Sequence, residues 1–572
     1  MNPASFSWLL AIPVLLPFMG AALSLVFSKR ILVPPIISVT VMSIVLADAG
    51  FLLYLTTKSP VVLDVGGWSA PIGITLVADQ LSAIMLFVSV FVTFSVLIYS
   101  LAEPYTESSR SPITIFHPTF LVLSAGVSNV FLTGDLFNMY VGFEILLFAS
   151  FVLITLGSTR DRIRSGTVYV VVSLVSSAIF LIGLAMTYAA TGTVNLAQLG
   201  LRLPEINPGI ALLIEAVLLV AFGIKAAVFP LSAWLPDSYP TAPAPVTAVF
   251  AGLLTKVGIY AIIRTQTLLF PETPVGNVLL VAGFATMVVG ILGALAQDDM
   301  KRMLSFTLVS HIGFMLWGVG LGTEMGLTAA IFYTAHHIIV QTALFLVSGL
   351  MEHIGGTTSL SRLGSLLKTA PFVAALYLIP ALNLSGIPPM SGFLGKIGLL
   401  QASVEVNTPL AWVSFGGGLV SSLLTLYVMT KAWNMAFWQE AETELPMRKA
   451  PPLMIGATTV LVVASLLLTI FSAPIYGFAS SAAADLKSRD PYINAVLPGG
   501  VRGTGGSEEE ASKGERQEQH PIPTPTVQQP GHSTPATPSP SPTPKQSEVS
   551  TPNASTTEET SSETAAPAEG GE

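Results

Sequence analysis

The sequence predicts an all-α polytopic membrane protein with about fourteen transmembrane helices. Of its 572 residues, 52% are hydrophobic and only 10% are charged, and the mean hydropathy is +0.70. A water-soluble domain does not tolerate this composition, so a lipid bilayer must be the solvent of the chain. Apolar runs long enough to cross a bilayer recur along the sequence, and two of them contain several prolines and glycines. We therefore expect a bundle of spanning helices in which two helices are broken.

Each predicted helix is a run of roughly 20 mainly apolar residues that ends at glycine, proline or charge. Lys29 and Arg30 follow the first run instead of preceding it, so we interpret that run as a retained span and not as a cleaved signal peptide. The predicted spans are 7–27, 32–56, 78–101, 112–132, 136–156, 166–190, 209–230, 242–265, 276–296, 303–322, 326–350, 371–403, 410–437 and 453–478.

Two interrupted segments divide these spans into matching units. Residues 222–245 and 380–396 carry prolines within apolar sequence, and proline breaks a helix because it lacks an N–H and clashes with the preceding turn. Each segment is the fourth span of a five-span unit, which makes the broken helices 7 and 12. Since five is an odd number, the second unit must begin on the opposite face of the membrane. The two units are therefore predicted to be inverted repeats, as in many transporters.

The chain is expected to divide into five parts on this basis. The tail is rich in Pro, Ser, Thr and Glu, and it cannot bury enough apolar surface to offset its chain entropy, so we expect it to be disordered. The predicted parts are helices 1–3 at 1–111, the first repeat at 112–265, the second repeat at 276–437, helix 14 at 453–478 and the tail at 485–572.

Basic residues predict how the helices are oriented in the membrane. An amino terminus outside the cell places most loop lysines and arginines on the cytoplasmic side, as the positive-inside rule requires. With an even number of spans, the carboxyl terminus is then also outside. The basic residues expected in cytoplasmic loops are Lys29, Arg30, Arg110, Arg160, Arg162, Arg164, Lys301, Arg302, Arg362, Lys368, Arg448 and Lys449.

Several ionisable residues fall inside the predicted spans, where a charge at the bilayer centre costs ~2.5–3.5 kcal/mol on insertion scales. Residues of this kind usually face the bundle interior and act in transport. Burial and a nearby carboxylate have opposite effects on the proton affinity of a lysine. A Glu144/Lys225 pair would therefore hold a proton while the two are close and release it when they separate. The candidate pathway residues are Glu144, Lys225, Lys256, His311, His336, His337 and Lys396.

Structural interpretations compete with the functional one for some residues. Lys396 follows a proline break, where a lysine can also bind freed backbone carbonyls, and each histidine can serve as a hydrogen-bonding group of the core. His336 and His337 point about 100° apart on a helix, so at most one of them should face a pathway. Asp48 and Asp79 lie toward the ends of their spans, where an anchor at the level of the lipid headgroups is the simpler interpretation.

Five long motifs surround the candidate residues in a fixed order. They are GDLFNMYVGFE (134–144), KAAVFPLSAWLPDSYPTAPAPVTAVFAGLLTKVG (225–258), QDDMKRMLSFTLVSHIGFM (297–315), HHIIVQTALFL (336–346) and LSGIPPMSGFLGK (384–396). Together they resemble the D-type subunits of the Mrp-type multi-subunit sodium/proton antiporters, which are related to the antiporter-like subunits of respiratory complex I. The resemblance covers about residues 1–500. It implies a fourteen-helix fold with inverted repeats and a proton axis that comprises the candidate residues above. Where the family often has a lysine in the eleventh helix, this chain has Gln341.

The resemblance implies a proton-translocating subunit of a cation/proton antiporter, a secondary transporter and not an enzyme. Its expected partners are other antiporter subunits in a hetero-oligomeric complex of the plasma membrane, with protons and Na+ as the transported ions. The alternatives are a proton-pumping membrane subunit of an NADH–quinone oxidoreductase or membrane-bound hydrogenase, and a scaffold that conducts nothing. The residues do not identify the exchanged cation.

Some function classes are excluded by composition. Cysteine is absent, so we expect neither a thiolate metal site nor a protein-held iron–sulfur cluster, and no cofactor is expected. The net charge of −8 comes largely from acidic residues of the tail, and the sequence has no basic patch for a nucleic-acid partner.

Overall fold

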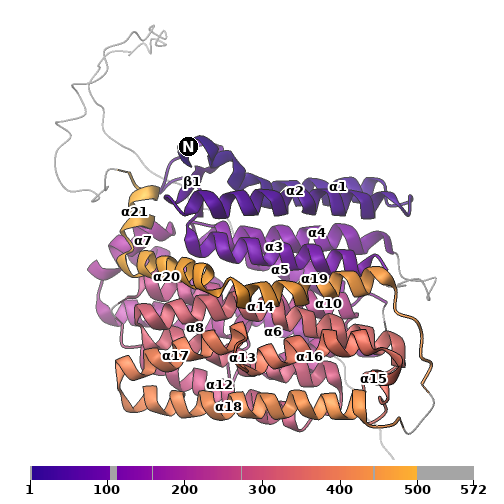
Figure 1. Ribbon diagram of the computed structural model, residues 1–572. Helices are drawn as coiled ribbons and strands as arrows, with labels where there is room; N and C mark the ends of the chain where they lie inside the picture. The colour runs from indigo at the N-terminus through magenta and orange to yellow at the C-terminus, as the bar shows by residue number, and fades with distance from the viewer. Residues whose placement is uncertain (1–2, 103–112, 158, 272, 442–444, 499–572) are drawn as a thin grey trace, which may run out of the picture. The chain divides into compact units, whose positions relative to one another are not determined.

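The computed structural model describes residues 3–102, 113–157, 159–271, 273–441 and 445–498 (Figure 1). Within these residues, 13 helices are long and apolar enough to cross a membrane. A further apolar segment is divided between two shorter helices, α16 (Pro371–Ser385) and α17 (Ser391–Val406). The chain is a multi-pass membrane protein, and the predicted number of about fourteen spans is confirmed.

Three helices and a hairpin precede the first five-helix unit. The hairpin is antiparallel, pairs Val61 with Ala78, and was not predicted from the apolar runs. The elements are η1 (Pro3–Ala11), which continues into α1 (Ile12–Val26), then α2 (Val33–Thr56), β1 (Val61–Asp64), η2 (Val65–Gly67), β2 (Thr75–Ala78) and α3 (Gln80–Ser100).

Each five-helix unit contains one interrupted span. The first unit consists of α4 (Ile113–Leu132), α5 (Leu136–Ile154), α6 (Arg160–Thr191), α7 (Leu196–Arg202), η3 (Leu203–Glu205), α8 (Pro208–Ala226), α9 (Trp234–Ser238), η4 (Tyr239–Thr241) and an eighth span made of α10 (Ala244–Val249), η5 (Phe250–Leu254), α11 (Thr255–Arg264) and η6 (Thr265–Leu269). The second unit consists of α12 (Gly276–Leu295), α13 (Met300–Leu321), α14 (Glu324–Gly355), α15 (Leu366–Thr369), the broken pair α16 and α17, α18 (Pro409–Trp433) and η7 (Asn434–Trp438).

The two units repeat the same local structures at a constant spacing. In the first unit, the side chain of Asp135 caps α5, and its backbone pairs with Asn195. In the second unit, Asp299 caps α13 and pairs with Ser359 in the same way. The two aspartates are as far apart in sequence as their two partners are. The long helices α6 and α14 both have 32 residues and both end at a left-handed glycine. With five spans in each unit, the repeats are inverted, as predicted.

Both predicted helix breaks are present. α8 ends at Ala226, and Ala227 adopts a left-handed backbone with a φ of 58°. α16 ends at Ser385, and the left-handed Gly386, with a φ of 81°, leads into the start of α17. A break leaves the last carbonyls of the helix without helical donors, so they must bind another group inside the protein.

Two spans are enclosed by protein on every side. In the eighth span and in α14, 100% of the most apolar window is buried, compared with 39% in α2 and α18. α14 contacts α3, α10, α13, α16, α17, α19 and α20. A helix that touches no lipid can hold polar side chains without exposing them to hydrocarbon. These two spans are therefore suited to a buried polar pathway.

Helix 14 is shorter than predicted. The predicted span at 453–478 corresponds to α19 (Pro452–Ile470), and a second helix, α20 (Ser472–Ser488), begins directly after it. α20 packs against both α3 and α14 (Figure 1). Ala479, Ala482, Ala483 and Leu486 are buried, which gives this less apolar stretch enough contact to remain helical.

The prediction of disorder from residue 485 onward is wrong for the first part of the tail. Residues 485–488 belong to α20, and Asp490–Val496 form α21. Tyr492 and Ile493 of α21 are buried, so this segment has a local apolar core that the composition of the whole tail conceals. Residues 499–572 lie outside the described residues.

Candidate functional site

The seven candidate residues lie on six different spans of the two repeats. Lys256, His311, His336 and His337 are each 0% exposed, and Lys396 is 5% exposed. Glu144 on α5 and Lys225 in the last turn of α8 are half-buried. Because the structure buries the lysines and histidines against protein, their polar groups avoid the hydrocarbon of the bilayer.

Glu144 and Lys225 lie near each other without forming a closed pair. Their charges interact, but within the described residues no ion pair of 4.0 Å or less joins them. The Lys225 Nζ lies 5.7 Å from the centre of the Phe143 ring. A cavity of about 20 Å³ adjoins Lys225 and is also lined by Tyr169 and Ser173. This volume is sufficient for a single water molecule between polar groups.

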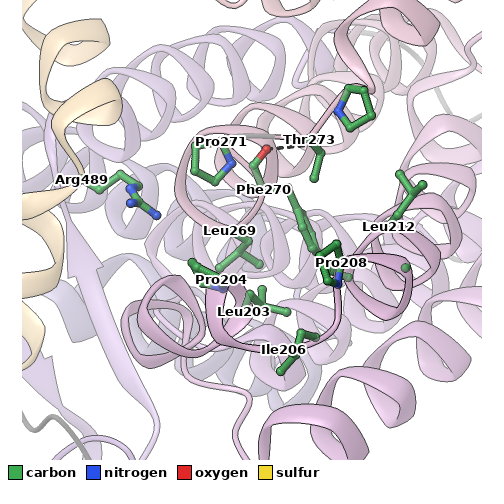
Figure 2. A pocket seen from close by; sticks show the side chains of 13 residues that line it. Leu203, Pro204, Ile206, Pro208, Leu212, Leu269, Phe270, Pro271, Thr273 and Arg489 are labelled. Atoms are coloured by element: carbon green, nitrogen blue, oxygen red, sulfur yellow. Dashed lines mark hydrogen bonds between the residues drawn. The ribbon is translucent and has the colours of Figure 1, made fainter.

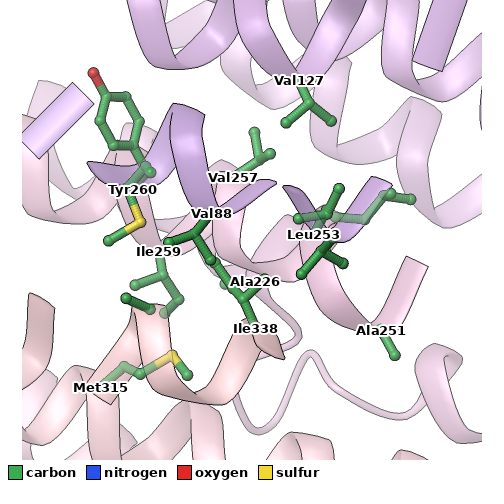
Figure 3. Packing of buried hydrophobic residues seen from close by; sticks show 14 of the residues in the cluster. Val88, Val127, Ala226, Ala251, Leu253, Val257, Ile259, Tyr260, Met315 and Ile338 are labelled. Atoms are coloured by element: carbon green, nitrogen blue, oxygen red, sulfur yellow. The ribbon is translucent and has the colours of Figure 1, made fainter. Parts of the chain in front are cut away.

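The helices that carry Lys225 and Lys256, α8 and α11, are in close contact. Gly258, two residues after Lys256, lies against the backbone next to Lys225, and a Cβ at Gly258 would come within 2.7 Å of the Ala226 nitrogen. Figure 3 shows Ala226 and Val257 within the same group of packed apolar side chains. The absence of a side chain at Gly258 therefore sets the distance between the two lysine-bearing helices.

Replacing Gly258 with alanine should destabilise the protein, although alanine normally favours a helix. The new Cβ would overlap the backbone of α8, so the helices must separate, at a cost of about 1–3 kcal/mol. The melting temperature of the purified protein measures this effect. Gly416→Ala is the matched control, because a Cβ at Gly416 meets no atom within 4 Å. Equal melting temperatures for the two variants would contradict the close contact.

Lys256 occupies the centre of the eighth span. Its Nζ donates a hydrogen bond of 2.6 Å to the carbonyl of Ala251. Ala251 belongs to η5, a π-helical turn, and such turns frequently occur at functional sites. Lys256 also interacts electrostatically with His337 of α14. The eighth span and α14 thus present their buried ionisable groups to each other.

The histidines and Tyr333 form one continuous cluster between α13 and α14. The rings of His311 and His337 are 5.3 Å apart, and the Nδ1 of His311 lies 2.5 Å from the Tyr333 hydroxyl. The ring of His336 is 5.4 Å from that of Tyr333, and its Nδ1 lies 3.0 Å from the Ser391 hydroxyl. Neither ring nitrogen of His337 has a hydrogen-bond partner among the described residues.

The expectation that at most one of His336 and His337 faces the pathway stays a prediction. His337 faces His311, while His336 faces Tyr333 and Ser391. The two side chains diverge as helix geometry requires. A ring nitrogen of His336 lies within hydrogen-bond distance of Ser391, whereas the ring of His337 packs against that of His311 with neither nitrogen hydrogen-bonded among the described residues.

Lys396 binds the helix break that precedes it. Its Nζ donates hydrogen bonds of 3.0 Å to the carbonyls of Leu384 and Ser385, which the break leaves free. It also lies 5.0 Å from the centre of the Phe314 ring. Lys396 lines a cavity of about 280 Å³ that extends to Leu423 on the exposed side of α18. Lys396 therefore caps the helix break, and one side of its side chain still faces a cavity.

Equivalent groups occupy the two repeats. Lys225 lies at the break of the first unit over Phe143, and Lys396 lies at the break of the second unit over Phe314. Tyr169 of α6 bonds Ser150 at 2.6 Å, and Tyr333, at the repeat spacing in α14, bonds His311. The two halves therefore build similar sites from different residues.

The sequence interpretation of Asp79 as a headgroup anchor is wrong. Asp79 is buried and forms a bidentate ion pair with Arg264, at 2.6 and 2.8 Å. Burial raises the pKa of Asp79, but the guanidinium and its hydrogen bonds outweigh burial and hold that pKa below its usual range. The ring of Tyr492 covers Arg264 at 4.9 Å. Asp79 and Arg264 fall at the ends of two predicted spans on the same side of the membrane. These opposite charges at one level were the signal that could have revealed the pair.

Asp48 is also buried, contrary to its interpretation as an anchor. It is 7% exposed within α2, and neither carboxylate oxygen has a hydrogen-bond partner among the described residues.

The part of the chain that the structure describes contains no group of three His, Asp or Glu side chains that could hold a metal ion. A separate cavity of about 480 Å³ is mostly apolar and contains none of the seven candidates (Figure 2).

Comparison with known proteins identifies the family. The family model described as NADH:quinone oxidoreductase/Mrp antiporter, TM, matches residues 133–425. The chain belongs to this family. It is 38% identical over 495 residues to the D-type subunit of the Na(+)/H(+) antiporter of Alkalihalophilus pseudofirmus, covering 86% of this chain and 99% of the relative.

Solved structures of the family have the same fold. A chain of the Mrp complex from Dietzia sp. superimposes with a TM-score of 0.81 and 31% identity, over 87% of this chain and 100% of the other. A chain of respiratory complex I from Thermus thermophilus gives a TM-score of 0.72 and 25% identity, over 84% and 99%. The family thus includes both antiporters and redox-driven complexes.

Proposed function

We propose that the chain is the proton-translocating subunit of a multi-subunit Na+/H+ antiporter. The observation that carries the proposal is that the two fully enclosed spans contain Lys256, His336 and His337. Ionisable groups in such positions mark ion pathways, because they are costly to keep there. The resemblance to D-type antiporter subunits over nearly their whole length supports the same assignment.

The proposed pathway follows the contacts from one repeat to the other. Protons pass from Glu144 and Lys225 to Lys256, and then through His337 and His311 toward Lys396. The open spacing of Glu144 and Lys225 fits a pair that closes and separates during transport. A membrane potential supplies ~2.3 kcal/mol per charge for each 100 mV, which can drive sodium out when more protons than sodium ions move.

Gln341 leaves one position of this pathway without a titratable group. Its amide nitrogen donates to the Leu304 carbonyl at 2.8 Å, and its amide oxygen has no partner among the described residues. We propose that transfer between Lys256 and the histidines bypasses Gln341, because His337 already interacts with Lys256. The amide then serves to hold α13 against α14.

The proposed setting is the plasma membrane, within a complex of antiporter subunits. The basic residues expected in cytoplasmic loops favour a cytoplasmic location for the end of the bundle that carries those loops, with both termini outside. The proposed division places helices 1–3 at 1–111 and the repeats at 112–265 and 276–437, followed by helix 14, which corresponds to α19. The protein is then a transporter subunit and not an enzyme.

Replacing Lys256 with glutamine tests the proposal. Loss of a positioned proton-transfer group should lower exchange by about 100-fold or more. Sodium-dependent collapse of a pH gradient in vesicles that contain the whole complex measures the rate. Lys431→Gln is the control, because Lys431 is partly exposed and binds the carbonyls of Leu295 and Gln297 at one end of α18. Exchange at the normal rate in an assembled Lys256→Gln complex would refute the assignment.

A redox-driven proton pump is the second candidate, favoured by the likeness to the complex I chain. The same pathway would then be driven by electron transfer in partner subunits. Purification of the native complex separates the two functions, because iron–sulfur subunits would accompany a redox pump. An antiporter complex would exchange sodium for protons in the absence of any electron donor.

A further inference from the structure

A polar stripe leads away from Lys256 along one face of the eighth span. Lys256, Tyr260 and Arg264 are spaced four residues apart, so they lie on the same face of α11. All three are buried. The stripe ends at the part of the protein that carries α21 and the β1–β2 hairpin, which contact each other. We call this end the α21 face.

Hydrogen bonds connect Tyr260 and Arg264 of the stripe to Ser82 and Asp79. The hydroxyls of Tyr260 and Ser82 are 3.1 Å apart, and the backbone of Ser82 donates to Asp79 at 2.8 Å. Arg264 donates to both hydroxyls, at 3.3 and 3.1 Å, in addition to its ion pair with Asp79. Tyr260 donates its own proton to the carbonyl of Phe131 at 2.8 Å. Figure 3 shows that the Tyr260 hydroxyl points away from the surrounding apolar side chains.

The Asp79 end of this cluster adjoins a small cavity beside α21. A narrow cavity of about 10 Å³ is lined by Asp79, Arg264, Tyr492, Asp485 and Arg489. Arg489 also lines the cavity of about 480 Å³, so its side chain adjoins both cavities (Figure 2). Burial and, second, the charge of Asp79 raise the pKa of Asp485. The Tyr492 hydroxyl and the Arg264 Nε have no hydrogen-bond partners among the described residues.

We propose that Asp485, Asp79, Ser82 and Tyr260 form a proton branch that connects Lys256 to the α21 face. The inference rests on the proposed function and adds a route of access to it. Arg264 is a positioning residue, because it stays charged and holds Asp79 and the two hydroxyls in one network. Tyr492 of α21 covers the outer end of the branch.

Transfer along the branch conserves protons at each position. Asp79 holds a proton only in transit, because the Arg264 ion pair favours its carboxylate form. The proton moves on to a hydroxyl, and that hydroxyl gives up its own proton, so Ser82 and Tyr260 end neutral. Lys256 receives the proton as an ammonium group. In the structure, the Lys256 Nζ binds the carbonyl of Ala251, and Ala251 lies toward the opposite end of the span from Tyr260 (Figure 3). Rotation of the flexible lysine chain from Ala251 toward Tyr260 opens the branch.

Tyr260→Phe tests the branch by removing one hydroxyl. Exchange per assembled complex should fall roughly 10-fold or more, because the hydroxyl relay is interrupted. Tyr377→Phe is the matched control, because Tyr377 is equally buried and donates to the Met429 carbonyl at 3.0 Å outside the branch. Equal exchange in the two variants would overturn the proposal.

Access to the branch can be measured directly, because the chain contains no cysteine. A Ser82→Cys variant should react with a small, membrane-impermeant thiol reagent added on the α21 side during exchange, and the reaction should inhibit exchange. Peptide mass analysis of this chain identifies the modified residue. Ser310→Cys is the control, since Ser310 is equally buried and bonds Met287 between α12 and α13. Reaction of Ser82→Cys only with reagent added on the opposite side would also overturn the branch.

The two proposals fail in distinguishable ways. If Lys256→Gln abolishes exchange while Tyr260→Phe behaves like its control, the branch is wrong and the proposed function stands. If Lys256→Gln exchanges normally, the proposed function is wrong, whatever Tyr260→Phe does.

Discussion

Replacing Lys225 with alanine is expected to abolish cation/proton exchange while the complex still assembles. Lys225 lies at the break after α8, beside Glu144 and a cavity, where its ammonium is the mobile partner of the proposed pair. Without it, Glu144 has no cation to close on, and the first transfer step is lost. The expected reduction is about 100-fold or more, as for other positioned proton-transfer groups. Sodium-dependent proton flux in vesicles that contain the whole complex measures it.

A surface pair provides the control for this experiment. Lys368 and Glu440 form an ion pair at 3.1 Å, but their side chains are 72% and 83% exposed. Lys368→Ala should leave exchange unchanged, because water replaces the lost partner. Glu144→Gln should resemble Lys225→Ala, since the amide cannot attract a proton. An active Lys225→Ala complex would remove the pair from the pathway.

The second large effect concerns stability. Replacing Arg264 with leucine leaves Asp79 buried and without its cation, which should cost about 3–5 kcal/mol. The melting temperature and yield of the solubilised complex measure this loss. Replacing Asp79 and Arg264 together by leucine should recover much of it, because no unpaired charge remains buried. In that double variant we expect the proton branch to stay interrupted although the fold is restored.

Arg302→Leu is the matched control for the buried pair. Arg302 bonds Asp237 at 2.8 Å, close to the length of the buried pair, but its side chain is 46% exposed. Its loss should cost only ~0–1 kcal/mol. A similar cost for Arg264→Leu would mean that Asp79 reaches water and is not sealed by Tyr492.

Much of the fold could be predicted from the sequence, because helix length and bilayer thickness are directly related. The positions of proline and glycine predicted the two broken helices, because the effects of these residues on the backbone are local. The β1–β2 hairpin and α21 were missed, because each is short and is stabilised by contacts with distant segments. The wrong predictions for Asp48 in α2 and Asp79 at the start of α3 show the same limit. The position of a residue along a helix does not reveal which neighbouring helix its side chain faces.

The candidate residues could be chosen from the cost of burying charge, but their contacts could not. Lys396 was recognised as either a proton carrier or a cap, and the freed carbonyls of Leu384 and Ser385 establish that it caps the break. Which histidine meets which partner also depended on packing. Tyr333 was not identified, because a tyrosine in an apolar run resembles ordinary core.

By itself, the sequence determined that this chain crosses the membrane repeatedly, breaks two helices and buries several charges, because these properties follow from composition and local backbone chemistry. The tertiary structure decided which charges meet. Asp79 and Arg264 are 185 residues apart, and their pairing depends on how α3 packs beside the eighth span. The energy of a buried charge depends on its neighbours, and those neighbours are set by helix packing and not by position along the chain.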